Sequence, residues 1–185
     1  APATKAGGTW TVLGRGTGGL KEPAAPIDFG NSGTGTRLMM GVIAGHGITV
    51  SMVGDASLSR RPMGRVLKPL RQMGLATLED KDTLPLTVRG TANLVPMEYV
   101  LPVPSAQVKS AILIAGLMAA GETTVVEKEK TRDHTERMLR YFGADPDEYA
   151  LAFTANASQA LKLVGESYPF APGDEFLLTF DNHNS

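Results

Sequence analysis

Apolar positions recur at helical spacing in four segments of the chain, and each segment ends at or beside a glycine. The segments span residues 34–46, 62–73, 105–120 and 133–143. This spacing places the apolar side chains of a helix on one face, so we predict four amphipathic helices. In the second segment the residues expected to face a core are Met63, Val66, Leu67, Leu70 and Met73.

The predicted helix starts carry residues that suit a helix N-terminus. Thr34 and Ser105 have hydroxyl groups suited to the N-cap, and Pro62 suits the first helical position. Asp133, with Glu136 three residues later, has the spacing of a capping box. We therefore expect helices to begin at these four places.

Short strand-like runs lie between the predicted helices. They occupy residues 48–53, 86–89, 97–101 and 123–127, and residues 80–85 have the composition of a turn. Alternation of helices with short strands is typical of the α/β class. We therefore predict an α/β fold.

The helix–strand units repeat along the chain. Thr34 opens a helix, a strand follows, and Arg61 lies just before the next helix. Ser105 and Arg132 stand in the same relation, each pair is separated by 27 residues, and the two units lie 71 residues apart. The sequence therefore predicts a domain built from similar helix–strand units.

The character of the chain changes at Asp145, so we divide it into a domain at residues 1–144 and an appended segment at residues 145–185. After a polar turn, this segment is predicted to form a strand, a helix and a strand at residues 150–154, 156–168 and 175–180. We predict a short βαβ-like tail. Because the sequence stops directly after a strand, we expect that a further segment is missing.

Composition and charge narrow the function classes. With 185 residues, of which 42% are hydrophobic, the chain is long enough for one domain with a core. A net charge of −1 argues against general nucleic-acid binding, and the absence of cysteine excludes disulfides and thiolate metal sites. The sequence has no stretch apolar enough for a membrane span or a signal peptide, so we expect a cytoplasmic protein without membrane partners.

Candidate anion-binding groups gather around a glycine-rich turn, GNSGTGTR at residues 30–37, which leads into a predicted helix. Free backbone N–H groups and the positive end of the helix dipole favour an anion there, and a plain capped loop is the alternative. The turn lacks the Lys-Ser/Thr pair of a Walker motif. Residues 56–78 contain five basic residues and no acidic one, which indicates either a solvated helix face or an anion site.

Three further side chains suit anion recognition. The guanidinium groups of Arg61 and Arg132, at matching places in the repeat, can bind phosphate or carboxylate through two hydrogen bonds. Ordinary surface arginines beside helix starts are the alternative. Gln107, in the first turn of the third helix, can donate its amide hydrogen to a ligand oxygen.

The histidines lack metal-ligand spacing, so we expect no metal site and expect His46 and His134 at the surface.

Four ordered motifs resemble those of the enolpyruvylshikimate-phosphate synthases. They are DFGNSGTGTRL at 28–38, GDASLSRRPMGR at 54–65, PSAQVKS at 104–110 and TRDHTERML at 131–139, and the similarity runs from about residue 9 to residue 144. The resemblance implies a fold of repeated βαβαββ units, with ligands held between two domains. It also implies a transferase of aromatic amino-acid biosynthesis, which moves the enolpyruvyl group of phosphoenolpyruvate to shikimate-3-phosphate without a metal or organic cofactor.

The resemblance assigns binding roles residue by residue. Those implied in phosphoenolpyruvate binding are Asn31, Ser32, Gly33, Thr34 and Arg61. Those implied in shikimate-3-phosphate binding are Ser105, Ala106 through its backbone, Gln107 and, on the phosphate, Arg132. In the family, alanine in place of Gly33 excludes the inhibitor glyphosate, so glycine at this position predicts a glyphosate-sensitive site.

The chain also departs from the family pattern. An earlier Lys-Ser…Arg motif has no match, and the sequence lacks the second domain with its acid/base carboxylates, so no catalytic residue is identified. Three alternatives to a transferase working as a single copy therefore stay open. In the first, copies of the chain associate and build a cleft between them. In the second, the chain binds shikimate-3-phosphate without turnover. In the third, it is a spliced gene product without a selected function.

Residues 150–185 resemble a different family, the class V aminotransferases near the molybdenum-cofactor sulfurases and cysteine desulfurases. The motifs are FTANASQALKLVGE at 153–166 and DNHNS at 181–185. The resemblance implies that Ser158 faces the phosphate of pyridoxal phosphate and that His183 stacks on its ring, although the Schiff-base lysine segment has no match. A pyridoxal-enzyme fragment fused to a synthase fragment is thus a further alternative, and we prefer a packing appendage.

Overall fold

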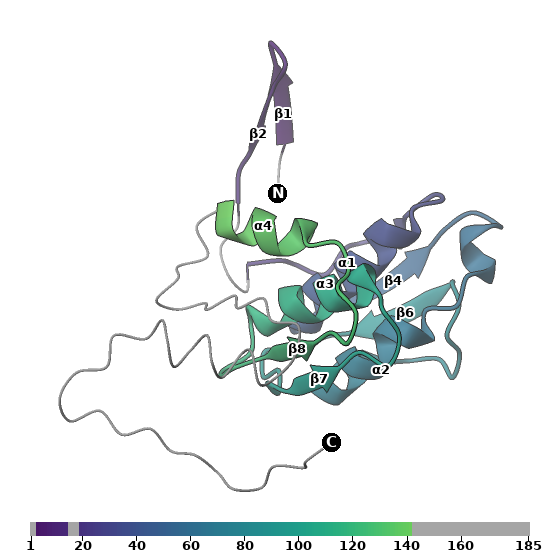
Figure 1. The fold of residues 1–185 in the computed structure, drawn as a ribbon. Coiled ribbons are helices and arrows are strands. Elements are labelled where there is room, and N and C mark those ends of the chain that lie inside the picture. Colours follow the sequence, from purple (N-terminus) through teal and green to yellow (C-terminus); the bar gives the residue numbers. More distant parts are fainter. Residues whose placement is uncertain (1–2, 15–18, 142–185) are drawn as a thin grey trace, which may run out of the picture.

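The computed structural model describes residues 3–14 and 19–141, which form a mixed arrangement of helices and short strands (Figure 1). The predicted α/β class is confirmed. Within the described part of the chain, no helix is long and apolar enough to cross a membrane. The elements predicted for residues 145–185 lie outside the described residues.

The first complete unit of the fold has the order strand, helix, strand, helix, strand, strand. Its members are β3 (Ile27–Asp28), α1 (Gly33–Ala44), β4 (Thr49–Val53), α2 (Gly64–Met73), β5 (Ala76–Thr77) and β6 (Leu86–Arg89). The sheet has the order β3-β4-β6-β5, in which β3 and β4 are parallel and β6 pairs antiparallel with β4 and β5. This is the βαβαββ unit that the resemblance implied.

A second unit begins in the same way. Its described members are β7 (Glu98–Val100), α3 (Ala106–Gly116), β8 (Thr124–Val126) and α4 (His134–Tyr141). β7 and β8 pair in parallel across α3, as β3 and β4 do across α1. The first residues of β3 and β7, Ile27 and Glu98, are 71 positions apart. The repeat predicted from the sequence is therefore present in the fold, with α1 and α3 as equivalent helices.

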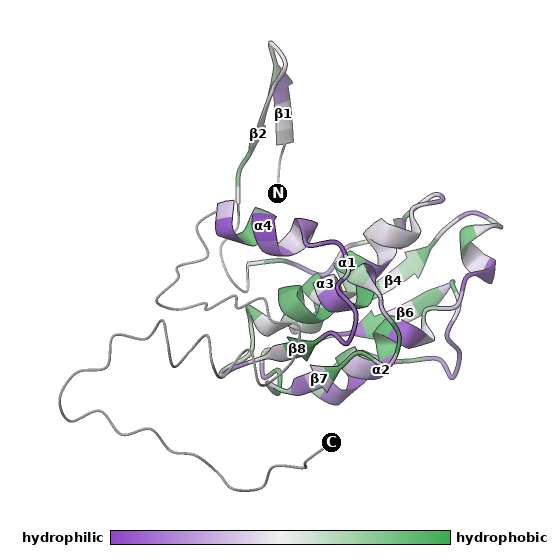
Figure 2. Ribbon diagram, in the orientation of Figure 1, coloured by the Kyte–Doolittle hydropathy of each residue, from purple (hydrophilic) through white to green (hydrophobic). Residues whose placement is uncertain are grey.

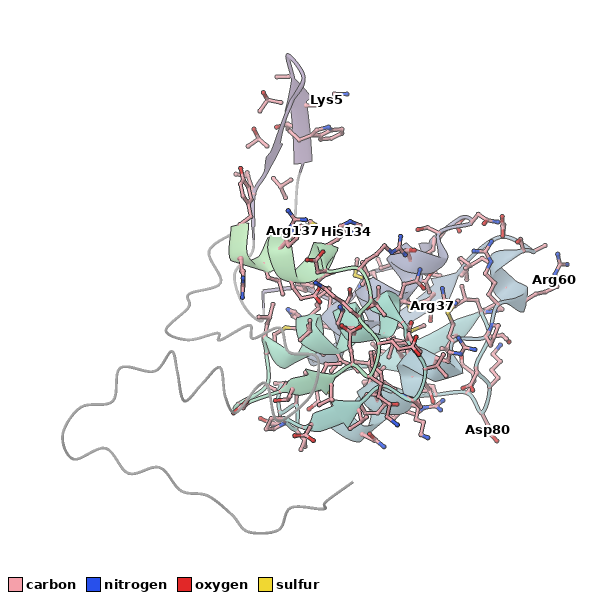
Figure 3. All side chains as sticks on the ribbon, viewed as in Figure 1. Lys5, Arg37, Arg60, Asp80, His134 and Arg137 are labelled. Carbon is pink, nitrogen blue, oxygen red and sulfur yellow. The ribbon has the colours of Figure 1, made fainter. Side chains whose placement is uncertain are left out.

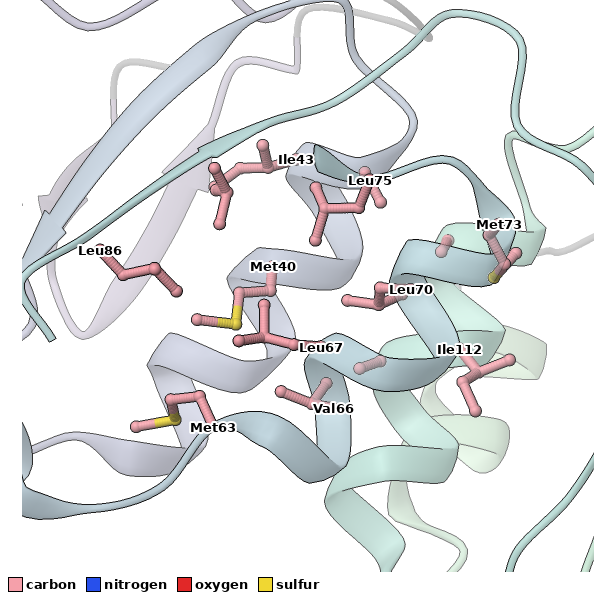
Figure 4. Close-up of a cluster of buried hydrophobic side chains, with 14 of the residues drawn as sticks. Met40, Ile43, Met63, Val66, Leu67, Leu70, Met73, Leu75, Leu86 and Ile112 are labelled. Carbon is pink, nitrogen blue, oxygen red and sulfur yellow. The ribbon is translucent and has the colours of Figure 1, made fainter. Parts of the chain in front are cut away.

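The main core lies where α1, α2 and α3 pack together against the four-stranded sheet (Figure 4). All five apolar residues predicted to face the core from the α2 segment are fully buried. Met40 and Ile43 of α1 and Ile112 of α3 complete the packing around them. Figure 2 shows the contrast with α4, which is largely hydrophilic.

α1 and α3 approach each other closely at a glycine. A Cβ atom on Gly41 would lie 2.4 Å from the carbonyl oxygen of Ala111 and 3.0 Å from its Cα. These atoms belong to the main chain of α3, so they move only if the helix moves. Gly41 therefore determines how closely the two equivalent helices pack.

A β-hairpin precedes the two units and projects away from them (Figure 1). It consists of β1 (Ala3–Ala6) and β2 (Thr9–Val12), joined at Gly7 and Gly8, which have φ angles of 54° and 86°. Trp10 is 63% exposed. This hairpin was not among the elements predicted from the sequence.

The predicted start of α2 is wrong, whereas α4 begins at His134, directly after Asp133, as expected. α2 begins at Gly64, two residues after Pro62, because Met63 is its N-cap: the carbonyl of Met63 accepts the first helical hydrogen bonds, and its N–H donates to the carbonyl of Asp82 at 2.7 Å. In α4, Glu136 does not complete a capping box. Its carboxylate instead lies 2.6 Å from the Nζ of Lys109 in α3, an ion pair that local sequence cannot reveal.

Candidate functional site

Hydrogen bonds within the glycine-rich turn shape the start of α1. Gly30, with a φ of 54°, donates its N–H to Asp28 Oδ1 at 2.8 Å. Ser32 is the N-cap, since its Oγ accepts from the N–H of Gly35 at 3.1 Å. The prediction that Thr34 caps this helix is therefore wrong. Thr34 lies inside the first turn, where its hydroxyl is available to a neighbouring element.

The start of α3 lies beside the start of α1. Ser105 caps α3 as predicted, because its Oγ accepts from the N–H of Val108 at 3.4 Å, and Ala106 is the first helical residue. Gln107 donates its Nε2 hydrogen to Thr34 Oγ1 at 2.7 Å, across 73 residues of sequence. The two equivalent helix starts therefore meet, and the positive ends of both helix dipoles lie close together.

Arg61 reaches the start of α1 through Asn31. It follows a short 3-10 helix, η1 (Leu58–Arg60), which the sequence analysis did not predict, and its Nη2 donates to Asn31 Oδ1 at 2.7 Å. Asn31 in turn donates its amide hydrogen to Asp55 Oδ2 at 2.6 Å. This bond and a backbone N–H from η1 lower the pKa of Asp55, so the carboxylate stays ionised near neutral pH.

Arg37 joins the segments of the site, although it was not among the site residues predicted from the sequence. Its Nη1 donates to the carbonyl of Gly33 at 3.2 Å and to Gln107 Oε1 at 2.9 Å. Its Nη2 donates to the carbonyl of Pro62, just before α2, at 3.4 Å. Partial burial lowers the pKa of Arg37, as do the charges of Arg61 and Arg65. An arginine remains a cation nonetheless. The available signal was its position one helical turn after Gly33.

Gly33 lies between two guanidinium groups. A Cβ atom there would be 2.9 Å from Arg37 Nη1 and 3.2 Å from Arg61 Nη1. Within the described residues neither arginine forms an ion pair with a carboxylate, and both donate to neutral oxygens. Two positive charges beside a residue without a side chain favour an anion bound against the turn.

Arg132 is a predicted site residue for which the described part of the chain shows no hydrogen bond to this group. It is exposed in the loop between β8 and α4. The other predicted residues lie on the two helix starts or, for Arg61, beside them. The place of Arg132 beside Ser105 stays a prediction.

The site offers anion-binding groups. Within residues 3–14 and 19–141, no set of three or more potential metal ligands is clustered. His46 is only 6% exposed and its Nδ1 lies 2.8 Å from the carbonyl oxygen of Val42, so its predicted surface position is wrong. His134 is exposed, as predicted. The groups gathered at the two helix starts are guanidinium, amide, hydroxyl and backbone N–H.

A cavity of about 240 Å³ opens beside Ser105. Arg65 and Lys68 of α2 place two cations at its wall. Its remaining lining residues are Gly64, Tyr99, Leu101, Pro102, Val103 and Val108. The cavity therefore joins an apolar wall to the positively charged side of the site.

Residues 3–164 match the protein family described as EPSP synthase (3-phosphoshikimate 1-carboxyvinyltransferase). The match runs past residue 144, and the division of the chain at that residue stays a prediction. Proteins named 3-phosphoshikimate 1-carboxyvinyltransferase from Parvibaculum lavamentivorans and Novosphingobium aromaticivorans are 63% identical over 141 residues and 54% identical over 163 residues. These alignments cover 75% and 88% of this chain, and 31% and 36% of the relatives.

A solved structure described as EPSP synthase from Acinetobacter baumannii is similar in fold, with a TM-score of 0.72 and 51% sequence identity. The likeness covers 77% of this chain and 32% of that chain. The present chain thus spans about a third of the length of the relatives that it matches.

Proposed function

Because the chain belongs to the EPSP synthase family, we propose that it binds phosphoenolpyruvate and shikimate-3-phosphate for enolpyruvyl transfer in the shikimate pathway. It would supply one part of the active site, since it spans about a third of its relatives' length. The observation that supports this best is the meeting of two helix starts at the Gln107–Thr34 hydrogen bond, beside Arg37 and Arg61. Both substrates carry phosphate, which helix starts and guanidinium groups bind.

Phosphoenolpyruvate is proposed to bind at the turn before α1. Arg61 would contact its charged oxygens, and Asn31 already orients this guanidinium at 2.7 Å. The backbone N–H of Thr34 would add a donor at the positive end of the helix dipole, whereas the N–H groups of Ser32 and Gly33 already donate to the carbonyls of Phe29 and Asn31 at 2.9 and 3.0 Å. Because Gly33 has no side chain, the guanidinium groups of Arg37 and Arg61 can lie against the turn there.

Shikimate-3-phosphate is proposed to bind at the start of α3, through Ser105, the backbone of Ala106 and Gln107, with Arg132 on its phosphate. The amide of Gln107 is held in one orientation, because its oxygen accepts from Arg37 and its nitrogen donates to Thr34. Gln107 thereby connects the two proposed substrate positions. We expect the binding of one substrate to affect the other through this amide.

A second candidate function is binding without turnover. Enolpyruvyl transfer requires proton donors and acceptors. Asp55, the carboxylate bonded to the turn, is kept ionised by Asn31 and is therefore a poor proton donor near neutral pH. Copies of the chain that associate would supply further groups, and size-exclusion chromatography with both substrates tests this.

An activity assay separates the two candidates. The purified chain is mixed with both substrates, and phosphate release and the enolpyruvyl product are followed, the product by mass spectrometry. Arg61→Ala is the test variant. Arg60→Ala is the matched control, since Arg60 is the adjacent arginine and points away from the body of the molecule (Figure 3). Turnover by the wild type and by Arg60→Ala, but not by Arg61→Ala, supports enolpyruvyl transfer. If the wild type releases no more phosphate than Arg61→Ala, the result contradicts enolpyruvyl transfer by this chain.

Ligand titration followed by NMR tests binding separately. Shikimate-3-phosphate should shift the amide signals of residues 105–107 and 132, and phosphoenolpyruvate should shift those of residues 31–34. Binding without product formation would identify a non-catalytic module. Unmoved amides at millimolar ligand would contradict both candidate functions.

The pyridoxal-phosphate hypothesis for residues 150–185 has its own test. Ser158 and His183 lie outside the described residues, so the hypothesis rests on sequence motifs alone. Pyridoxal phosphate is added to the chain, and its absorbance is compared with that of a Ser158→Ala and His183→Ala double variant. Identical spectra that match the free compound would contradict this hypothesis.

A further inference from the structure

A buried group of three charges lies next to the candidate site and is not part of it. The Nζ of Lys109, in α3, is 2.8 Å from Glu127 Oε2 and 2.6 Å from Glu136 Oε1. The side chains of the three residues are 5%, 14% and 3% exposed, in that order. They come from α3, from the residue that follows β8, and from the first turn of α4. The group therefore joins three elements of the second unit.

Stability alone is a weak explanation for this group. Removing charges from water is costly, and apolar side chains of similar volume often stabilise a core as well or better. Burial would lower the pKa of Lys109, but the bonds to Glu127 and Glu136 outweigh it and raise this pKa, so the lysine is a cation. One lysine faces two carboxylates, and Glu136 Oε2 is buried without a hydrogen-bond partner among the described residues. What the group clearly provides is a defined position for the elements that it joins.

The position of Lys109 on α3 links it to the candidate site. It lies one helical turn after Ser105, to whose carbonyl it donates its N–H at 3.0 Å. Residues four apart on a helix share a face. Lys109 therefore extends from the side of α3 that carries Ser105.

The two carboxylates bracket the loop that carries Arg132. Glu127 lies before residues 128–133 and Glu136 lies after them. Thr131, next to Arg132, donates its hydroxyl to Glu127 Oε1. A bond of 2.7 Å from the Thr135 hydroxyl to that of Ser110 adds a second tie between α4 and α3. Both ends of the loop are thus attached to the first turns of α3.

We propose that Lys109, Glu127 and Glu136 are positioning residues, which hold Arg132 at the start of α3 so that it and Ser105–Gln107 act on one phosphorylated ligand. This inference rests on the proposed function, because shikimate-3-phosphate is the ligand that it assigns to the loop. The group itself does not touch the ligand. Its effect on binding passes through Arg132 alone.

A double-mutant cycle tests that dependence. Glu127→Gln keeps the shape of the side chain, leaves the Lys109–Glu136 pair in place and is the mild variant for folding. Glu129→Gln is the matched control, since it removes the same charge at an exposed position two residues away. Each change is made in the wild-type chain and in Arg132→Ala, and the Kd values of shikimate-3-phosphate and phosphoenolpyruvate are measured with the melting temperature.

Glu127→Gln should weaken shikimate-3-phosphate binding about tenfold in the wild-type chain and about twofold or less in Arg132→Ala. Phosphoenolpyruvate binding and the Glu129→Gln control should change about twofold or less. An equal loss in both backgrounds, or no loss at all, would overturn the inference while leaving the proposed function intact. If the wild-type chain binds no shikimate-3-phosphate, the proposed function fails first and the inference with it.

Discussion

Replacing Gly41 with alanine should destabilise the chain, although alanine is the better helix former. Within a helix the change from glycine to alanine is worth about 1 kcal/mol in favour of alanine. The new Cβ would lie 2.4 Å from the carbonyl oxygen of Ala111, about 1 Å closer than ordinary contact. The obstacle is main chain, so α1 and α3 must separate. Overpacking of this kind costs about 1 to 3 kcal/mol, and here it should exceed the gain.

We expect a net loss of up to about 2 kcal/mol for Gly41→Ala, which lowers the melting temperature by up to about 8 °C in a chain of this size. Thermal unfolding followed by far-ultraviolet circular dichroism measures this change. Separating the helices should also break the 2.7 Å bond from Gln107 to Thr34, so the amide signal of Gln107 should move in NMR spectra.

Gly47→Ala is the control for Gly41→Ala. A Cβ atom on Gly47 would meet no heavy atom within 4 Å, and its φ lies outside the left-handed region. Alanine at such a position restricts the unfolded chain, so Gly47→Ala should stabilise the folded state by about 0.4 to 1 kcal/mol. A Gly41→Ala chain that melts at or above the wild-type temperature would contradict the inference that the close approach of α1 and α3 excludes a side chain at residue 41.

Three further predictions concern single residues of the site and the buried charges. Gly33→Ala should weaken phosphoenolpyruvate and glyphosate binding about tenfold in calorimetric titrations, because its Cβ crowds the guanidiniums of Arg37 and Arg61 at 2.9 and 3.2 Å. Because the pKa of Asp55 is lowered in the folded chain, its carboxylate stabilises the fold at pH values above the ordinary aspartate pKa, and this stabilisation is lost as the pH falls. Asp55→Asn should therefore flatten the decline in denaturation midpoint between about pH 5 and pH 2. The raised pKa of Lys109 gives stability that is complete below its ordinary value of 10.5 and is lost above it, and Lys109→Met should remove that alkaline decline.

Much of the fold could be predicted from the sequence because it follows from local periodicity. The five apolar residues of the α2 segment are buried as their spacing indicated. The repeat interval of 71 residues reappears between β3 and β7. The hairpin at residues 3–12 was missed, although Gly7-Gly8 between alternating residues is a signal for a tight turn.

The site was only partly predictable, because its geometry depends on contacts between distant segments. Ser105 was identified as a cap from its place before a helix. Arg37 was not identified as a site residue, since its bond to Gln107 spans 70 residues of sequence. A single lysine in an apolar helix, such as Lys109, is usually exposed, and only the fold shows two carboxylates facing it.

The solitary tryptophan of the sequence determines which optical probe can follow unfolding. Trp10 is on the projecting hairpin, 63% exposed, with the Lys5 ammonium 5.4 Å from the centre of its ring. Its indole fluorescence therefore reports on the hairpin and its solvent, while the three packed helices can melt without changing the emission. A fluorescence trace that stays flat through the melting transition would be the normal behaviour of this chain.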